Sequence, residues 1–284
     1  MIVPMYHKAL ATLVAFATLP AVLPAAEQKP RELLQPPTMA IASPITDHFS
    51  LRGSYYQPSI STDMRYDPAS GTPGTAFSAE DTFGMDDELN KGTLEMMIRL
   101  RDRNRLRVDF FKLTRHGDAV LTNGLQFGDD TYLVGDRVVS DLDVRMLNLT
   151  YTYSVIRAER FEFGVGAGIH LIQAEGMGAV PLRGLSQEFD VAGPFLTFAV
   201  DGTYRVTDRF SLNARAQYFG LGIDEVDGSL GMYHADVQFR AWKNLAFGLG
   251  YTKTTLSVES TDPDFTGRLG LDVTGPEAFV RVSF

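Results

Sequence analysis

The dominant pattern in the chain is a strict alternation of apolar and polar side chains, which begins near residue 45. It is clearest between residues 146 and 155. There one face carries Leu147, Leu149, Tyr151, Tyr153 and Val155, and the other carries Met146, Asn148, Thr150, Thr152 and Ser154. A period of two is typical of β-strands, in which successive side chains point to opposite sides of the sheet. Most of the chain is therefore predicted to be strand.

Segments of this kind recur along the chain and are separated by polar connections that contain Gly and Asp. We count about ten strands, with eight or twelve as alternatives, because residues 121–134 could add a hairpin. The predicted strands are 49–60, 94–102, 105–116, 142–156, 161–173, 194–206, 210–222, 231–242, 245–257 and 270–284. An even number brings both ends of a barrel to the same side of a membrane.

The alternation alone fits two all-β folds, because an apolar strand face is buried in a soluble sandwich but faces lipid in a membrane barrel. Connection lengths distinguish the two. Short connections at 102–104, 156–160, 207–209 and 243–244 alternate with long ones at 61–92, 116–143, 173–193, 222–230 and 254–274. Short periplasmic turns and long outer loops are typical of outer-membrane barrels. We therefore predict a closed antiparallel transmembrane β-barrel.

The first 25 residues have the features of a secretory signal peptide: a weakly basic start, an apolar segment at 10–19 and a small-residue exit at 20–25. This apolar segment is shorter than the run of about 20 residues that a membrane-spanning helix needs. Residues 26–44 are rich in proline and show no apolar period. The predicted organisation is a signal peptide at 1–25, a periplasmic linker at 26–44 and a barrel at 45–284.

The last ten residues place Ala278, Val280, Val282 and the terminal Phe284 on one face. This segment resembles the closing strand of bacterial outer-membrane barrels, and residues 71–75, 80–81 and 84–87 resemble a loop pattern of small members of that group. The chain is similar in architecture to the OmpA and OmpW transmembrane domains. We also expect the strand that ends at Phe284 to pair with the strand that begins near Phe49, because an open edge in lipid leaves backbone groups unsatisfied.

The resemblance implies a place in the Gram-negative outer membrane, with lipid and lipopolysaccharide as neighbours. It also implies that Val280, Val282 and Phe284 are the signal that the barrel assembly machinery recognises. It implies no chemistry. Composition excludes other classes: the chain has no cysteine, so it has no disulfide framework and no cysteine-linked lipid anchor. A net charge of -9 without a basic stripe argues against nucleic acid as a partner, and no cofactor is expected.

Carried through each strand, the alternation places charged side chains on the face that would line the lumen. Both signs occur in comparable numbers, and buried charges are tolerated only when they are paired. We therefore predict an ion-pair network in a narrow lumen, not a wide pore. Its main predicted members are Arg52, Asp201, Arg215, His234, Asp236, Arg240, Glu277 and Arg281. One expected pair joins Arg215 to Asp236 or to a neighbour one step along the barrel.

Two lumenal histidines could carry chemistry. His234 and Asp236 lie two residues apart on one strand face, so that the acid could orient the imidazole as a general base. His170 is alone on its face. No serine or other nucleophile accompanies either histidine in a motif, and a structural role is the simpler interpretation.

Acidic residues in the predicted outer loops could bind Ca²⁺ or Mg²⁺, because hard cations prefer carboxylate oxygens. The candidates are Glu80, Asp81, Asp86, Asp87, Asp129 and Asp130. Their spacing is not that of an EF-hand loop, and solvated surface acids are the simpler interpretation.

No catalytic motif stands out from this pattern, and we expect a non-enzymatic envelope barrel with a structural or surface-interaction role and a narrow, charge-filled lumen. One alternative is a porin-like channel for small solutes. The other is an outer-membrane hydrolase that acts on lipid A or on peptides. A hydrolase would need His234 or His170 at the outer rim, within hydrogen-bond reach of a serine or a second acid.

Overall fold

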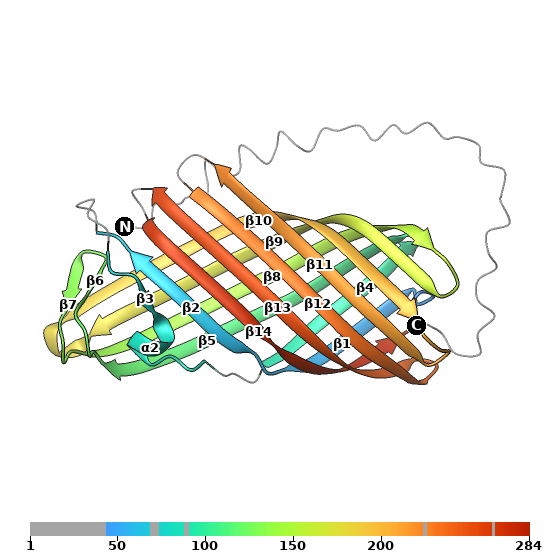
Figure 1. The fold of residues 1–284 in the computed structure, drawn as a ribbon, viewed down its shortest axis with the longest axis horizontal. Coiled ribbons are helices and arrows are strands. Elements are labelled where there is room, and N and C mark those ends of the chain that lie inside the picture. Colours follow the sequence, from blue (N-terminus) through green and yellow to red (C-terminus); the bar gives the residue numbers. More distant parts are fainter. Residues whose placement is uncertain (1–43, 69–73, 88–90, 224–225, 263–264) are drawn as a thin grey trace. The chain divides into compact units, whose positions relative to one another are not determined.

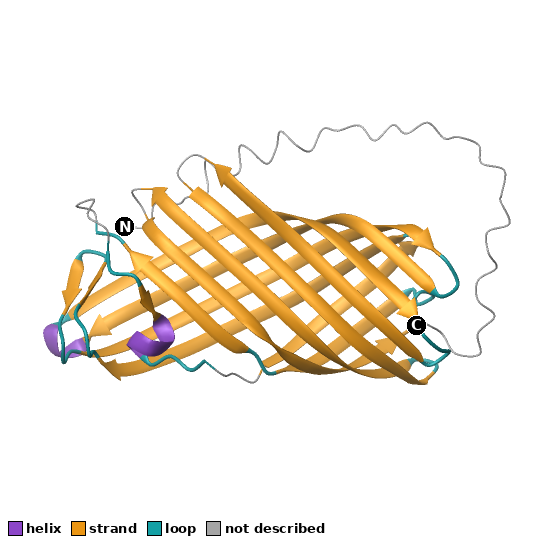
Figure 2. Cartoon of the chain, in the orientation of Figure 1, coloured by secondary structure: helices purple, strands orange, loops and turns teal. Residues whose placement is uncertain are grey.

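A computed structural model of the chain describes residues 44–68, 74–87, 91–223, 226–262 and 265–284 (Figure 1). The predicted signal peptide and all of the predicted linker except Pro44 lie outside these ranges. Strands dominate the described residues (Figure 2). Within these ranges no helix combines the length and the hydropathy that a membrane-spanning helix requires.

The strands form a closed antiparallel barrel of ten wall positions, as the sequence predicts. β6 and β7 pair with each other in a separate sheet, so residues 121–134 do contain a hairpin, but this hairpin is not part of the wall. The elements in chain order are β1 (Phe49–Tyr56), β2 (Ser59–Tyr66), β3 (Phe77–Ser78), α2 (Ala79–Phe83), β4 (Lys91–Arg101), β5 (Asn104–Val120), β6 (Leu125–Phe127), β7 (Asp130–Tyr132), β8 (Arg137–Arg157), β9 (Phe161–Val180), η2 (Pro181–Arg183), β10 (Leu185–Arg205), β11 (Phe210–Ile223), β12 (Val226–Trp242), β13 (Leu245–Asp262) and β14 (Phe265–Ser283).

The barrel closes where the sequence predicts, between the first and last strands. β1 pairs with the second half of β14, and β2 pairs with the first half of the same strand. Pro58 separates β1 from β2 and, because proline has no N–H, it cannot donate to the ladder. The Gln57 amide bridges the break by donating to Pro276 O at 3.1 Å. β1 and β2 therefore occupy one wall position, which is longer than the predicted strand 49–60.

Three strands are much longer than predicted: β8, β9 and β10 have 21, 20 and 21 residues. Crossing a bilayer takes about 9–11 residues of a tilted strand. About half of each strand therefore lies beyond the membrane. The predicted long loops at 116–143, 173–193, 222–230 and 254–274 are largely wrong, because strands fill most of these ranges. Following the predicted orientation, we name the end with the short turns and Phe284 the periplasmic end, and the opposite end the outer end.

The two faces of β8 exchange their polarity part-way along the strand. In the half toward the periplasmic end, the outward side chains from Leu147 to Val155 are apolar, and the buried inward ones include Asn148 and Thr150. In the half toward the outer end, the outward residues include Asp141, whereas the inward side chains Val138, Leu142, Val144 and Met146 are buried and apolar. This exchange explains why the sequence predicts a loop at 116–143. In the outer half of β8 the outward side chains are mostly polar, as they are in a solvated connection.

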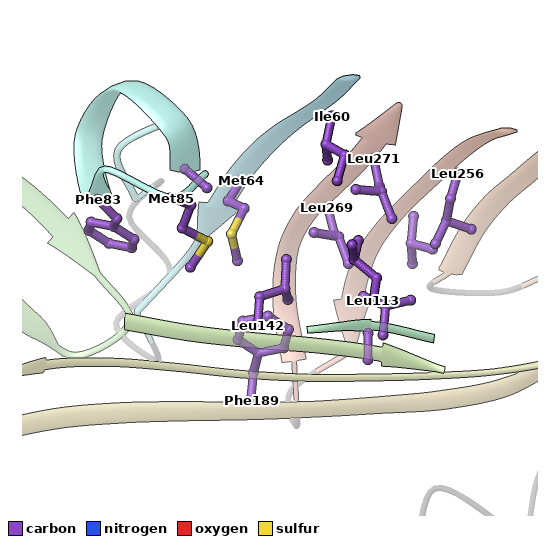
Figure 3. Packing of buried hydrophobic residues seen from close by; sticks show 14 of the residues in the cluster. Ile60, Met64, Phe83, Met85, Leu113, Leu142, Phe189, Leu256, Leu269 and Leu271 are labelled. Atoms are coloured by element: carbon purple, nitrogen blue, oxygen red, sulfur yellow. The ribbon is translucent and has the colours of Figure 1, made fainter. Parts of the chain in front are cut away.

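Apolar side chains from most of the wall fill the interior of the outer half. Figure 3 shows Leu256, Leu269 and Leu271 across the interior from Leu113 and Leu142. Full burial of a leucine side chain stabilises the fold by roughly 1.5–3 kcal/mol relative to exposure. The outer half is thus held together as a soluble barrel would be, by an apolar core.

The β6–β7 hairpin lies against this core. The Phe127 ring lies 5.5 Å from the ring of Tyr66 and 6.0 Å from that of Phe83. The Tyr132 hydroxyl donates to Gly178 O at 2.7 Å, and both hairpin aromatics are almost fully buried. The hairpin therefore covers part of the apolar core.

We predict that deletion of Phe284 lowers the yield of assembled barrel in cells. The residue closes the seam, because its carbonyl accepts the amides of His48 and Phe49 at 2.9 and 3.0 Å, and its own amide donates to Phe49 O. Heat-modifiable migration of membrane extracts measures the folded fraction. Phe284→Trp is the matched control and should assemble normally. Equal folded yields for the deletion and the parent chain would contradict the prediction.

Candidate functional site

The lumen is closed at its periplasmic end by the segment that precedes β1. The side chain of Asp47 is buried and pairs with Arg240 at 2.5 Å and with Arg281 at 3.4 Å. The backbone carbonyl of Asp47 accepts a hydrogen bond from Arg99 Nε at 3.2 Å. Ile45 beside it is also buried. Chain that precedes the first strand therefore fills this end of the lumen.

Above this closure, arginine and carboxylate side chains cross the lumen. Arg99 donates two hydrogen bonds to Glu162, at 2.7 and 2.9 Å, and both side chains are 0% exposed. Arg105 pairs with Asp201 at 2.6 Å and lies 3.6 Å from Glu162. Buried pairs of this kind are costly to break, because removal of one partner leaves an uncompensated charge.

A second cluster lies toward the middle of the barrel. Arg52 pairs with Asp236 at 3.0 Å and with Glu277. His234 Nε2 lies 2.7 Å from Asp236, and its Nδ1 lies 2.9 Å from the Thr252 hydroxyl. The imidazole is thus held on both nitrogens within the network.

All eight predicted lumen residues lie in the interior, and the structure joins most of them in two groups: Arg52, His234, Asp236 and Glu277 in the first, and Arg240 with Arg281 in the second. The expected partner of Arg215 is wrong, because Arg215 pairs with Glu95. The ladder places Arg215 opposite His234, and Asn213 opposite Asp236, so the expected register was two residues off. The predicted lumen residues do not include Asp47, which precedes the first strand, where no alternation marks it. They also omit Arg105, although it lies two residues from Arg107 on β5 and therefore shares the same inward face.

The histidine geometry gives no hydrolytic arrangement at the outer rim. His170 is fully buried and lies 2.6 Å from Asn148, 2.8 Å from the Thr197 hydroxyl and 2.9 Å from Gln217. His234 has a second acid, because Glu277 lies 3.3 Å from its Nδ1. Both histidines, however, stand inside the lumen at the level of the membrane-facing strand segments, and the contacts of the described residues bring no serine hydroxyl to either ring.

Among the described residues, no wall strand pairs with β5 in the outer half on the side away from β8. β4 pairs with β5 only as far as Leu94 opposite Phe110, whereas β5 continues to Val120 along β8. The segment that contains α2 lies between β2 and β5. Its Glu80 accepts the Thr62 amide of β2 at 3.0 Å and pairs with Arg115 of β5 at 2.7 Å. Glu80 therefore connects the two strand edges across the gap.

Glu80 is one of the acids that the sequence suggests for metal binding, but in the structure it binds the Thr62 amide and the Arg115 guanidinium. Burial raises the pKa of the Glu80 carboxyl, but the Thr62 amide and the Arg115 guanidinium outweigh burial and hold it below its ordinary value of 4.5. Its stabilising effect is therefore present above about pH 4.5 and is lost as the pH falls through the lowered pKa. Of the other candidates, Asp130 accepts a hydrogen bond from Gln187 at 3.0 Å. The described residues contain no group of three or more His, Asp or Glu side chains that could hold a metal ion.

A cavity of about 120 Å³ lies between the charged network and the apolar core. Its polar lining includes Glu95, Asp109 and Arg215, and its apolar lining includes Phe111 and Met232. The sequence did not predict this cavity, because it depends on which inward positions of different strands meet at one height.

No protein-family model matches the chain, and no curated protein matches it. Solved structures do. The outer-membrane protease OmpT from Escherichia coli aligns over 83% of this chain and 97% of its own, with a TM-score of 0.53 and 9% identity. The fold is that of an outer-membrane β-barrel. The transport unit of the autotransporter AIDA-I from Escherichia coli (TM-score 0.43, 9% identity, 97% and 98% covered) and Ail of Yersinia pestis (0.35, 10%, 82% and 99%) align more loosely.

The outer wall of this outer-membrane barrel agrees with that fold. A belt of exposed apolar side chains, which we name the lipid belt, surrounds the half nearer the periplasmic end. It includes Leu51, Tyr55, Leu94, Phe110, Leu147, Leu149, Tyr151, Val165, Ile169, Phe198, Val200, Leu212, Tyr218, Val237, Leu249, Tyr251, Val280 and Phe284. A closed wall satisfies every ladder group in lipid, and the protein resides in the outer membrane of a Gram-negative cell.

We predict that Glu80→Ala destabilises the refolded barrel by about 3 kcal/mol, because the fully buried Arg115 guanidinium then loses its carboxylate. The double variant Glu80→Ala/Arg115→Met should be more stable than the single variant, since no buried charge remains. Equilibrium urea unfolding in detergent micelles measures both. Asp81→Ala, at the exposed neighbouring position on α2, is the matched control. A loss below 1 kcal/mol for Glu80→Ala would contradict this role for the pair.

Proposed function

We propose that the protein is a non-enzymatic, non-conducting envelope barrel. Its outer half projects from the cell surface and binds other molecules there. The single observation that carries this proposal is the filling of the lumen at three successive levels. The Asp47 closure, the ion-pair network with Arg99 and Glu162, and the apolar core of the outer half each occupy the interior. A conduit would need an open path through all three.

The form of the outer half supports a role at the surface. On β8 the outer face of this half is polar, and its interior is apolar, an arrangement that suits contact with water in place of lipid. The long strands β8, β9 and β10 extend the wall as a continuous hydrogen-bonded sheet, where the sequence predicts loops. Rigid scaffolds of this kind position the residues that contact other molecules.

Lipopolysaccharide is the partner that we propose for the base of this extension. Lys112 and Arg145 stand opposite each other on β5 and β8, one outward step beyond Phe110 and Leu147 of the lipid belt. Asp143 lies 3.2 Å from Lys112 and 2.8 Å from Arg145, so the three side chains carry one net positive charge. Lysine and arginine at this height can bind the phosphates of the lipid head group.

The proposal predicts that the refolded barrel gives no stepwise conductance in planar bilayers at high salt. The reason is that the filled lumen leaves no continuous water path. A heat-denatured sample controls for contaminating porins. Steady conductance steps that depend on folded protein would overturn the proposal and favour a small-solute channel.

For lipopolysaccharide, we predict that Lys112→Gln/Arg145→Gln weakens binding severalfold, because both phosphate-directed cations are lost. Fluorescence anisotropy of labelled lipopolysaccharide with detergent-solubilised barrel provides the measurement. Arg137→Gln is the matched control, since Arg137 lies farther out on β8 and pairs with Asp118 at 2.5 Å. If the double variant and the control bind equally, head-group recognition at this pair is wrong.

A further inference from the structure

The cavity between the network and the core has a floor and a roof of different chemistry. Carboxylates and arginines of the network form its floor, with Asp109 among them. Its roof is apolar and includes Phe111, Met146, Met232 and Val273. Its volume of about 120 Å³ approaches the roughly 150 Å³ of an apolar protein cavity that holds benzene. The space therefore suits a compact molecule with one apolar end and one polar end.

The cavity reaches the barrel wall at the point where two strands separate. Leu94 opposite Phe110 is the last pair between β4 and β5, and both residues line the cavity. Their side chains are 55% and 49% exposed on the outer wall, at the outer edge of the lipid belt. Beyond this pair β4 follows β1 and β5 follows β8. A molecule at the surface of the outer leaflet would meet the cavity here.

Asp109 differs from the other acids of the network. Glu95 pairs with Arg215, and Glu277 pairs with Arg52. In the described part of the chain, the carboxylate of Asp109 has no arginine or lysine nitrogen within the 4 Å of an ion pair, and it accepts a hydrogen bond from the Asn148 amide at 2.5 Å. A carboxylate in the interior without a cation is unfavourable. A positively charged ligand group beside it would supply the missing partner.

We propose that the cavity binds a small organic ammonium compound, with the ammonium group on Asp109 and the apolar body between Phe111, Met146 and Met232. The ring of Phe111 adds a favourable surface for a cation. An anionic ligand fits less well, because Arg52 and Arg215 are already engaged by Glu277 and Glu95, and the anion would lie beside Asp109. This site is independent of the surface role proposed above.

Benzylamine is the probe, and benzyl alcohol and benzoate are its neutral and anionic counterparts of similar size. Isothermal titration of the refolded barrel in zwitterionic micelles, with empty micelles subtracted, should give saturable binding of benzylamine at neutral pH. Benzyl alcohol should bind at least about tenfold more weakly, and benzoate should not bind. This comparison uses the unmodified protein, so it does not depend on whether a variant folds.

Asp109→Asn then tests the assigned residue, because it removes the charge and keeps the size of the side chain. We expect benzylamine binding to fall at least about tenfold and benzyl alcohol binding to stay unchanged. Met232→Trp, which fills the cavity, should abolish binding of both. Heat-modifiable migration confirms that each variant is folded. Equal binding of benzylamine to the parent and to folded Asp109→Asn, or equal binding of all three probes, would overturn the proposal.

Discussion

One continuous wall of strands must satisfy two different surroundings, and this constraint determines the rest of the structure. Near the periplasmic end the outer face meets lipid, so its side chains are apolar and the polar ones turn inward. Beyond the membrane the same wall meets water, and the faces of β8 exchange between Leu147 and Arg145. Because β5, β8, β9 and β10 stay paired with one another along both halves, this part of the wall continues across the boundary without a break.

The kind of side chain that fills the interior depends on what surrounds the wall at the same height. At the level of the lipid belt, inward residues such as Arg99 and Glu162 are charged, and they must neutralise one another across a narrow lumen. In the outer half the inward residues form an apolar core, which supplies the hydrophobic stabilisation that lipid contact replaces lower down. The two kinds of interior meet at the cavity that Asp109 and Met232 line.

Much of this could be predicted from the alternation of side chains. The all-β fold and the lumenal position of Arg52 and its partners follow from a period of two. The choice of a membrane barrel also needed the connection lengths, and the seam at Phe284 needed the terminal segment and the requirement that no edge stay open in lipid. The sequence does not predict the strands of the outer half, because there the period of two continues with polar side chains outward and apolar side chains inward. The pairing of Arg215 with Glu95 could not be derived, since it joins strands that are not neighbours and depends on the barrel's tilt and register. Asp47 precedes the first strand, where no period exists.

The exchange of faces can be measured directly, because the chain has no cysteine and single cysteines can be introduced one at a time. Nitroxide labels at Leu149, Asp141 and Val144 of β8 would report accessibility to oxygen and to a polar nickel complex in lipid vesicles. We expect label 149 to be accessible to oxygen in lipid, label 141 to be accessible to the polar complex in water, and label 144 to be accessible to neither. A label at 144 as accessible to the polar complex as that at 141 would contradict an apolar, filled outer half.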